Sequence, residues 1–239
     1  MFDQRALRGT RVHLSGRLNS RTYVKPIPAI ACVDVGSEPG WAVVQGNSLS
    51  HGSSLEKLVQ MISTVLTSRK KLALGFECPL YVPRKPLGYH GFQGRIGEGS
   101  YSWNGPVGLR VLGAGLVQVN QVLSQLPSIA QGTIGTTRWS DFEFGPANLL
   151  LWEAFVTSRS GAEVGLRSEW LVGLSQHEKD ALAAAKLFEL RAANETVRSE
   201  LGDDAGLSLA GMQLLATGLS SDLSLLTETC LVIRTRKPS

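Results

Sequence analysis

Two continuous apolar runs, separated by the patterns of a hairpin and a helix, restrict the fold of this chain more than any other feature. The runs cover residues 29–35 (AIACVDV) and 71–77 (KLALGFE), and the second, which Pro79 ends, is typical of a strand inside a parallel sheet. Residues 36–44 predict a turn and a second strand, and residues 53–68 carry the apolar stripe of an amphipathic helix. A right-handed crossover through this helix makes the two runs parallel and places them side by side or nearly so.

The rest of the chain continues the alternation of helices and strands. Its patterns predict a strand around 48–50, a helix over 111–126, a strand over 148–155, a long helix over 176–199, a short helix over 208–217 and a last strand over 229–235. We therefore predict a single α/β domain over residues 26–239, with a glycine-rich insertion at 84–115. A long insertion of this kind usually has a functional role or is disordered.

Composition restricts the setting in which the chain works. No apolar run reaches the ~18 residues needed to span a membrane, and the N-terminus lacks the hydrophobic stretch of a secretory signal. The three cysteines show none of the C-x-x-C spacing of zinc sites, and we interpret them as small buried hydrophobes in a reducing compartment. These features predict a cytoplasmic protein with no membrane contact.

The first 25 residues form a basic arm. They hold six Lys and Arg residues against a single Asp, whereas the whole chain has a net charge of only +4. Such an arm can hold a polyanion electrostatically. A disordered leader, or a start codon assigned too far upstream, would explain the same bias equally well.

Acidic residues end both apolar runs and recur near the start of the long late helix. Asp34 and Glu77 fall at the carboxyl ends of strands that we expect to be parallel neighbours, where open α/β sheets bind their ligands. His177 and Asp180 are three residues apart and share one helix face. Glu178 is spaced to form a capping box with Ser175. Taken singly, Asp180 could only complement the helix dipole and Asp34 could only cap a turn, but together they predict one site.

These motifs resemble the RuvC-type branch of the ribonuclease H-like superfamily, which includes Holliday-junction resolvases. The His-x-x-Asp pairing at 177–180 is the most specific part of the resemblance, which covers most of residues 29–195 in order of elements. The strings VDVG at 33–36 and FECPL at 76–80 also resemble an uncharacterised group of predicted nucleases in that superfamily. In that group a glutamate recurs in a setting similar to Glu153.

The resemblance implies a ribonuclease H-like mixed sheet with flanking helices and a metal-dependent nuclease. Asp34, Glu77 and Asp180, with His177 as a nitrogen ligand, would hold Mg²⁺ or Mn²⁺. Two such ions ~3.5–4 Å apart activate a water and stabilise the leaving oxygen of a phosphodiester. Glu153 would lie just outside these ligands, or would be a strand acid with a partner of its own. Resolvase-like enzymes act as dimers, which leaves a homodimer open.

The glycine-rich insertion mixes aromatic and basic side chains. Such a mixture suits stacking on bases and contact with phosphates, as in proteins that bind single strands. A surface loop whose aromatics pack locally would have the same composition. The predicted nucleic-acid contacts are Arg84, Lys85, Arg95, Tyr101, Trp103 and Arg110.

Two other functions compete with the nuclease. The turn DVG at 34–36 also resembles the phosphate-binding turn of small kinases of the actin-like superfamily, whose loop backbone would cradle ATP phosphates. A catalytically inactive protein of the same fold could instead use the basic arm and the insertion to hold nucleic acid. DNA and RNA remain equally open as partners.

Overall fold

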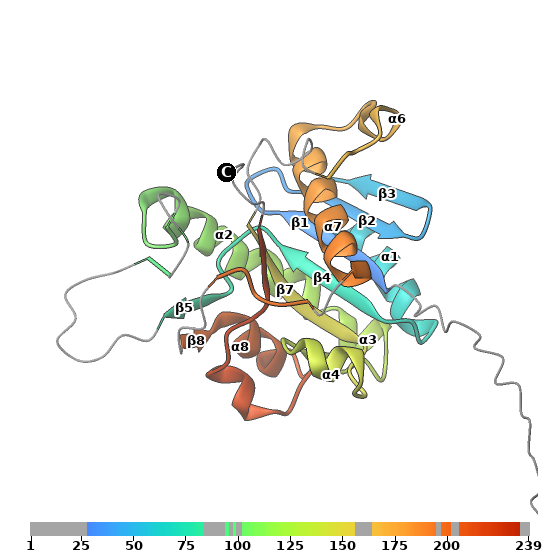
Figure 1. Ribbon diagram of the computed structural model, residues 1–239. Helices are drawn as coiled ribbons and strands as arrows, with labels where there is room; N and C mark the ends of the chain where they lie inside the picture. The colour runs from blue at the N-terminus through green and yellow to red at the C-terminus, as the bar shows by residue number, and fades with distance from the viewer. Residues whose placement is uncertain are drawn as a thin grey trace, which may run out of the picture.

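The computed structural model describes residues 28–83, 94–95, 98, 102–155, 164–194, 197–201 and 206–234. The predicted basic arm at 1–25 lies outside this part of the chain. At its centre is a seven-stranded mixed sheet with helices on both faces (Figure 1). The strands run in the order β3 (Ser48–Gly52), β2 (Gly40–Gln45), β1 (Ala29–Asp34), β4 (Leu72–Phe76), β7 (Leu149–Phe155) and β6 (Gly135–Thr136), and β9 (Val232–Arg234) also pairs with β7.

The antiparallel hairpin of β1 and β2 and the parallel pairing of β1 with β4 match the sequence prediction. β2 and β3 are antiparallel to their neighbours, whereas β1, β4, β7, β6 and β9 are parallel. The predicted α/β class is therefore confirmed, and its mixed sheet is consistent with ribonuclease H-like topology. A separate two-stranded sheet joins β5 (Tyr81–Pro83) to β8 (Gly206–Ser208).

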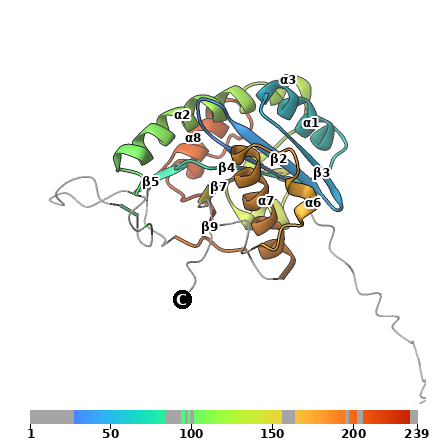
Figure 2. The same ribbon diagram turned by 90° about the horizontal axis from the view of Figure 1, so that it is seen from above.

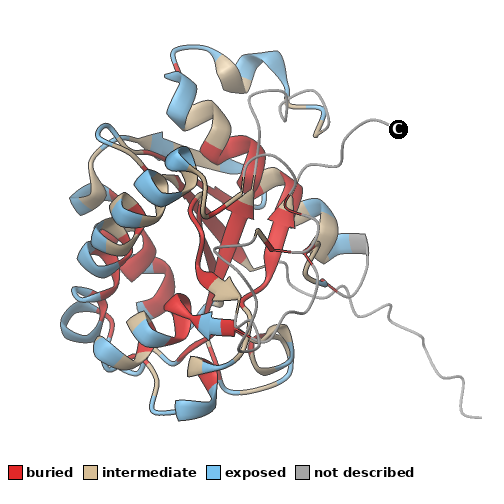
Figure 3. Ribbon diagram, turned by 90° about the vertical axis from the view of Figure 1, so that its left-hand side faces the viewer, coloured by how far each residue is buried: buried red, intermediate tan, exposed pale blue. Residues whose placement is uncertain are grey.

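Helices cover both faces of the main sheet, as the view from above shows (Figure 2). One face carries α1 (Leu55–Thr67), α2 (Pro106–Leu123), α3 (Leu126–Ile129) and α8 (Leu209–Ala216), and the other carries α4 (Trp139–Glu143) and α7 (Gln176–Asn194). The short helices α6 (Ser168–Leu171) and η1 (Leu223–Leu226) flank α7 and α8 in the chain. The strands of the main sheet are buried except for the edge strand β3, and the helices expose their outer faces (Figure 3). None of the described helices is long and apolar enough to cross a membrane.

The alternation of side chains along each strand decides which acid faces which helix layer. In β1 and β4, Val33 and Phe76 pack in the core under α1 and α2, whereas Cys32 and Ala73 pack in the core under α7. Successive side chains of a strand point to opposite faces. The next residues, Asp34 and Glu77, therefore both lie on the face that α7 covers.

Part of the predicted insertion is helical. α2 begins at Pro106, a residue that suits a first helical turn, and it includes three glycines of the predicted insertion, of which Gly113 and Gly115 also fall in the predicted helix over 111–126. Two of these glycines serve close packing: a Cβ on Gly108 would lie 2.3 Å from the carbonyl oxygen of Ser102, and one on Gly115 would lie 2.4 Å from Sγ of Cys78. The helix therefore lies close to the segments beneath it, and glycine there does not mean a pliable loop.

Candidate functional site

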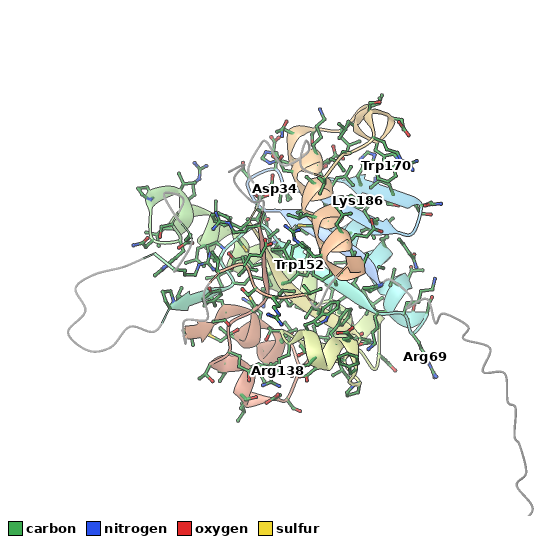
Figure 4. The ribbon with its side chains drawn as sticks, viewed as in Figure 1. Asp34, Arg69, Arg138, Trp152, Trp170 and Lys186 are labelled. Carbon is green, nitrogen blue, oxygen red and sulfur yellow. The ribbon has the colours of Figure 1, made fainter. Side chains whose placement is uncertain are left out.

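The site begins at the turn between β1 and β2, which follows Asp34 directly. This turn is held from the α2 side, where Gln118 donates from Nε2 to the carbonyl oxygen of Gly36 and accepts from the Gly36 N–H at 3.4 Å. Asp34 itself lies beside the first turns of α7 (Figure 4). The end of β1 is thus fixed between helices on the two faces of the sheet.

The start of α7 packs directly on the first residue of β2. A Cβ on Gly40 would lie 2.4 Å from the carbonyl carbon of His177 and 2.5 Å from the backbone nitrogen of Glu178. The predicted capping box is confirmed, because the Ser175 N–H donates to Glu178 Oε2 at 2.7 Å and the Glu178 N–H donates to Ser175 Oγ at 3.3 Å. Glycine at position 40 therefore allows the helix to approach the sheet at this point.

This approach brings His177 to Asp34. Nδ1 of His177 lies 2.6 Å from Oδ2 of Asp34, and the two side chains are 49% and 15% exposed. The hydrogen bond to Asp34 raises the pKa of His177 above its usual value. Burial raises the pKa of Asp34, and it outweighs the opposing effect of His177. The pair is therefore a hydrogen-bonded imidazole and carboxyl group at the rim of the sheet.

Asp180 lies one helical turn from His177 and acts on both members of this pair. Its charge contributes to the raised pKa of Asp34 and to that of His177. Oδ1 of Asp180 accepts a hydrogen bond from Nε2 of Gln176 at 2.9 Å. Asp180 thus adds a carboxylate from the helix to the one that Asp34 supplies from the sheet.

Glu77 enters the same edge from β4. Its backbone N–H donates to the carbonyl oxygen of Val33 at 2.8 Å, which continues the parallel ladder one residue past Phe76 and sets Glu77 level with Asp34. Burial raises the pKa of the Cys32 thiol, and the charges of Glu77 and Asp34 add to that increase. The structure therefore brings Asp34, Glu77, His177 and Asp180 to one edge of the sheet.

The side chains at this edge already hold one another. Among the described residues, no group of three or more His, Cys, Asp and Glu side chains is arranged to hold a metal ion. Asp34 is hydrogen-bonded to His177, and Asp180 to Gln176. By type alone, the three carboxylates supply the oxygen donors that a hard divalent cation prefers, and the imidazole adds one nitrogen donor. Such a cation would have to compete with the two hydrogen bonds.

Glu153 does not join this group. It is level with Phe76 in the parallel ladder of β7 and β4, and its strand neighbours Leu151 and Phe155 pack on the α1 and α2 side. There its carboxylate accepts two hydrogen bonds from the guanidinium of Arg95, both at 2.6 Å, and one from the Leu80 N–H at 2.9 Å. Of the two readings that the sequence allowed, the structure shows the strand acid with its own partner.

The predicted nucleic-acid contacts divide into three groups. Arg95 and Trp103 are buried, and Arg95 lies between Glu98 and Glu153, so neither side chain fits the predicted contact surface. Arg110 is exposed on α2. The other three, Arg84, Lys85 and Tyr101, lie outside the described residues.

Sequence patterns did not identify a second carboxylate and imidazole pair beside the first. Nδ1 of His51, on β3, lies 2.8 Å from Oε1 of Glu178. Burial alone would raise the pKa of Glu178, but hydrogen bonds from His51 and Ser175 outweigh it and hold that pKa below its usual value. The only sequence signal was the position of His51 on a strand that pairs with β2, since no spacing links residues 127 apart.

Comparisons of this chain with protein-family models, with curated proteins and with solved structures found no match. Fold and site together define a class: an α/β protein whose mixed sheet is consistent with ribonuclease H-like topology. Its acidic and imidazole side chains gather where β1 and β4 end beneath the start of α7.

Proposed function

We propose that this protein is a divalent-metal-dependent nuclease that hydrolyses phosphodiester bonds of nucleic acid. One observation carries the proposal: Asp34 and Glu77 end adjacent parallel strands on the same face, and the first turn of α7 adds His177 and Asp180. The resemblance of these motifs to the RuvC-type branch supports the same conclusion. Nothing in the sheet order speaks against it.

Mg²⁺ or Mn²⁺ would be held by Asp34, Glu77 and Asp180, with His177 as a nitrogen ligand. When bound, such ions supply an activated water and stabilise the leaving oxygen. Burial of Asp34 makes its negative charge costly, and a divalent cation would offset that cost.

The test compares wild type with Asp34→Asn on a mixed panel of single-stranded, duplex and branched DNA and RNA, with Mn²⁺ or Mg²⁺. Glu189→Gln is the matched control, because Glu189 is on the same helix but pairs with Lys186, away from the site. We expect metal-dependent cleavage by wild type and the control and its loss in Asp34→Asn. Cleavage that survives in Asp34→Asn would contradict the proposal. Equal binding of nucleic acid by all three proteins without any cleavage would instead favour an inactive binding protein.

The kinase alternative has less support from the geometry. A phosphate cradle at residues 34–36 would use the backbone N–H groups of the turn. Gln118 already bonds both backbone polar groups of Gly36. ATP binding by the wild-type protein that weakens in Asp34→Asn would restore this alternative.

A further inference from the structure

The first turn of α7 is tied to the sheet by two consecutive residues, each through a carboxylate and imidazole pair. His177 contacts Asp34 at the end of β1, and Glu178 contacts His51 on the edge strand β3. The two side chains of the second pair, His51 and Glu178, are 38% and 13% exposed. The helix start is therefore held at two points on strands that lie on either side of β2.

The capping box cannot by itself place the helix on the sheet. The hydrogen bonds between Ser175 and Glu178 are local to the helix start, and they determine the residue at which α7 begins. The position of that turn over the strands depends on contacts with the sheet. At β2 this contact is the close approach at Gly40, and at β3 it is the bond between His51 and Glu178.

The register of the strands puts His51 on the correct face for this contact. His51 is paired with Ala42 across β2 and β3, and Ala42 packs in the core that α7 covers. Its neighbour Ser50 is paired with Val43, which packs on the opposite side of the sheet. A histidine one position earlier on β3 would therefore point away from the helix.

We propose that His51 and Glu178 are positioning residues, which hold the first turn of α7 over β1 and β2 so that His177 and Asp180 face Asp34. Glu178 uses both carboxylate oxygens for this task, one toward Ser175 and one toward His51. The effect of this positioning on metal binding rests on the proposed function, whereas its effect on the placement of His177 does not.

The experiment measures the imidazole ¹⁵N chemical shifts of His177 by NMR in metal-free protein at one fixed pH. His51→Leu removes the contact to Glu178, His51→Gln keeps a hydrogen-bond donor, and Ser50→Ala is the matched control on the opposite face of β3. We expect His177 in His51→Leu to shift toward the values of a free imidazole, and to return toward wild type in His51→Gln. We expect no change in Ser50→Ala.

A second variant keeps the test decisive if His51→Leu does not fold. Glu178→Gln can retain the capping box, because Gln also serves at that position, while it weakens the ion pair with His51. If the backbone NMR spectrum shows that Glu178→Gln is folded, the His177 chemical shifts should still differ from those of the wild type. If His51→Leu or Glu178→Gln folds and its His177 chemical shifts are the same as in the wild type, the positioning role is overturned.

A separate readout distinguishes this inference from the nuclease. Loss of a group bonded directly to a metal ligand typically weakens metal affinity about 10–100-fold. His51 acts through Glu178 and the helix start, so Mn²⁺ binding by calorimetry should weaken in His51→Leu by no more than that factor. If wild type binds no Mn²⁺ and cleaves nothing, the proposed function fails. A shifted His177 signal in His51→Leu would still support the positioning role in that case.

Discussion

Replacing Arg95 by Met should lower the free energy of unfolding of the protein, because it removes the positive charge buried beside β7. The Arg95 guanidinium lies between the carboxylates of Glu153 and Glu98, at 2.6 Å and 2.8 Å, and all three side chains are almost fully buried. Methionine fills a similar volume but leaves two carboxylates without a positive partner. Each acid keeps some hydrogen bonds, from the Leu80 N–H to Glu153 and from the Trp103 N–H to Glu98.

The size of the loss follows from the charges left behind. Removal of one partner of a buried ion pair costs about 3–5 kcal/mol, because the remaining charge stays desolvated. For a domain of this size, about 2–4 °C of melting temperature corresponds to each kcal/mol. We therefore expect Arg95→Met to lower the melting temperature by roughly 6–20 °C near pH 7.

The loss of stability in Arg95→Met should depend on pH through Glu153. Burial raises the pKa of Glu153 in the wild type, and it outweighs the opposing effect of Arg95. Without Arg95 that pKa should rise further, so the folded variant binds a proton that the unfolded chain releases above about pH 4.3. The difference in unfolding free energy between variant and wild type should therefore shrink as pH falls from 7 to 5.

Urea unfolding at several pH values measures this difference, and Arg95→Met combined with Glu153→Gln provides the control. The double variant removes one buried negative charge and should recover part of the lost stability at pH 7. A free energy of unfolding for Arg95→Met within about 1 kcal/mol of the wild-type value at pH 7 would contradict this prediction, because an unpaired buried charge costs more than that.

Three further substitutions test other parts of the fold. Gly40→Ala should cost about 1–3 kcal/mol through the clash of its Cβ with the backbone at His177, measured by urea unfolding, and NMR should show a changed His177 imidazole signal. Lys71→Met should cost about 1–3 kcal/mol, since the Lys71 ammonium donates to three backbone carbonyls at the end of α4. Hydrogen bonds from Ser224 and Arg138 hold the pKa of Asp222 at about 2, below its unfolded value, so its contribution is present above about pH 4 and is lost as pH falls through 2. Between pH 4 and 2 the wild type should therefore lose more melting temperature than Asp222→Asn.

The elements that sequence predicted well are those with a strong local pattern. The first two strands, α1, β4 and the capping box of α7 each follow from residues close together in the chain. The two-residue strand β6 and the short α4 lack enough residues to form a periodic pattern, and neither was predicted. α2 was predicted to begin at 111 and begins at Pro106, because Gly108 packs closely against the backbone of Ser102 and Trp103, a contact that only the tertiary structure shows.

Local patterns could not separate buried from exposed charges in the insertion. Arg95 follows glycine and aromatic residues, a context that predicts an exposed loop cation. Its partner Glu153 is 58 residues away on a strand that is apolar on both faces, so no spacing rule connects them. The same limit applies to His51 and Glu178. The predicted roles of Asp34, Glu77, His177 and Asp180 remain predictions, although the structure places these residues at one edge of the sheet.

Strand register, and not the end of a strand, decides which acids can share a site. Val33, Phe76 and Glu153 are level with one another across β1, β4 and β7. Asp34 and Glu77 come one residue later, and a shift of one residue in a strand exchanges the two faces of the sheet. The residue of β7 level with them is Ala154, which packs under α7. The sheet therefore contributes two carboxylates to this face and no third from β7, and the further carboxylate there, Asp180, comes from the helix that Gly40 allows to approach.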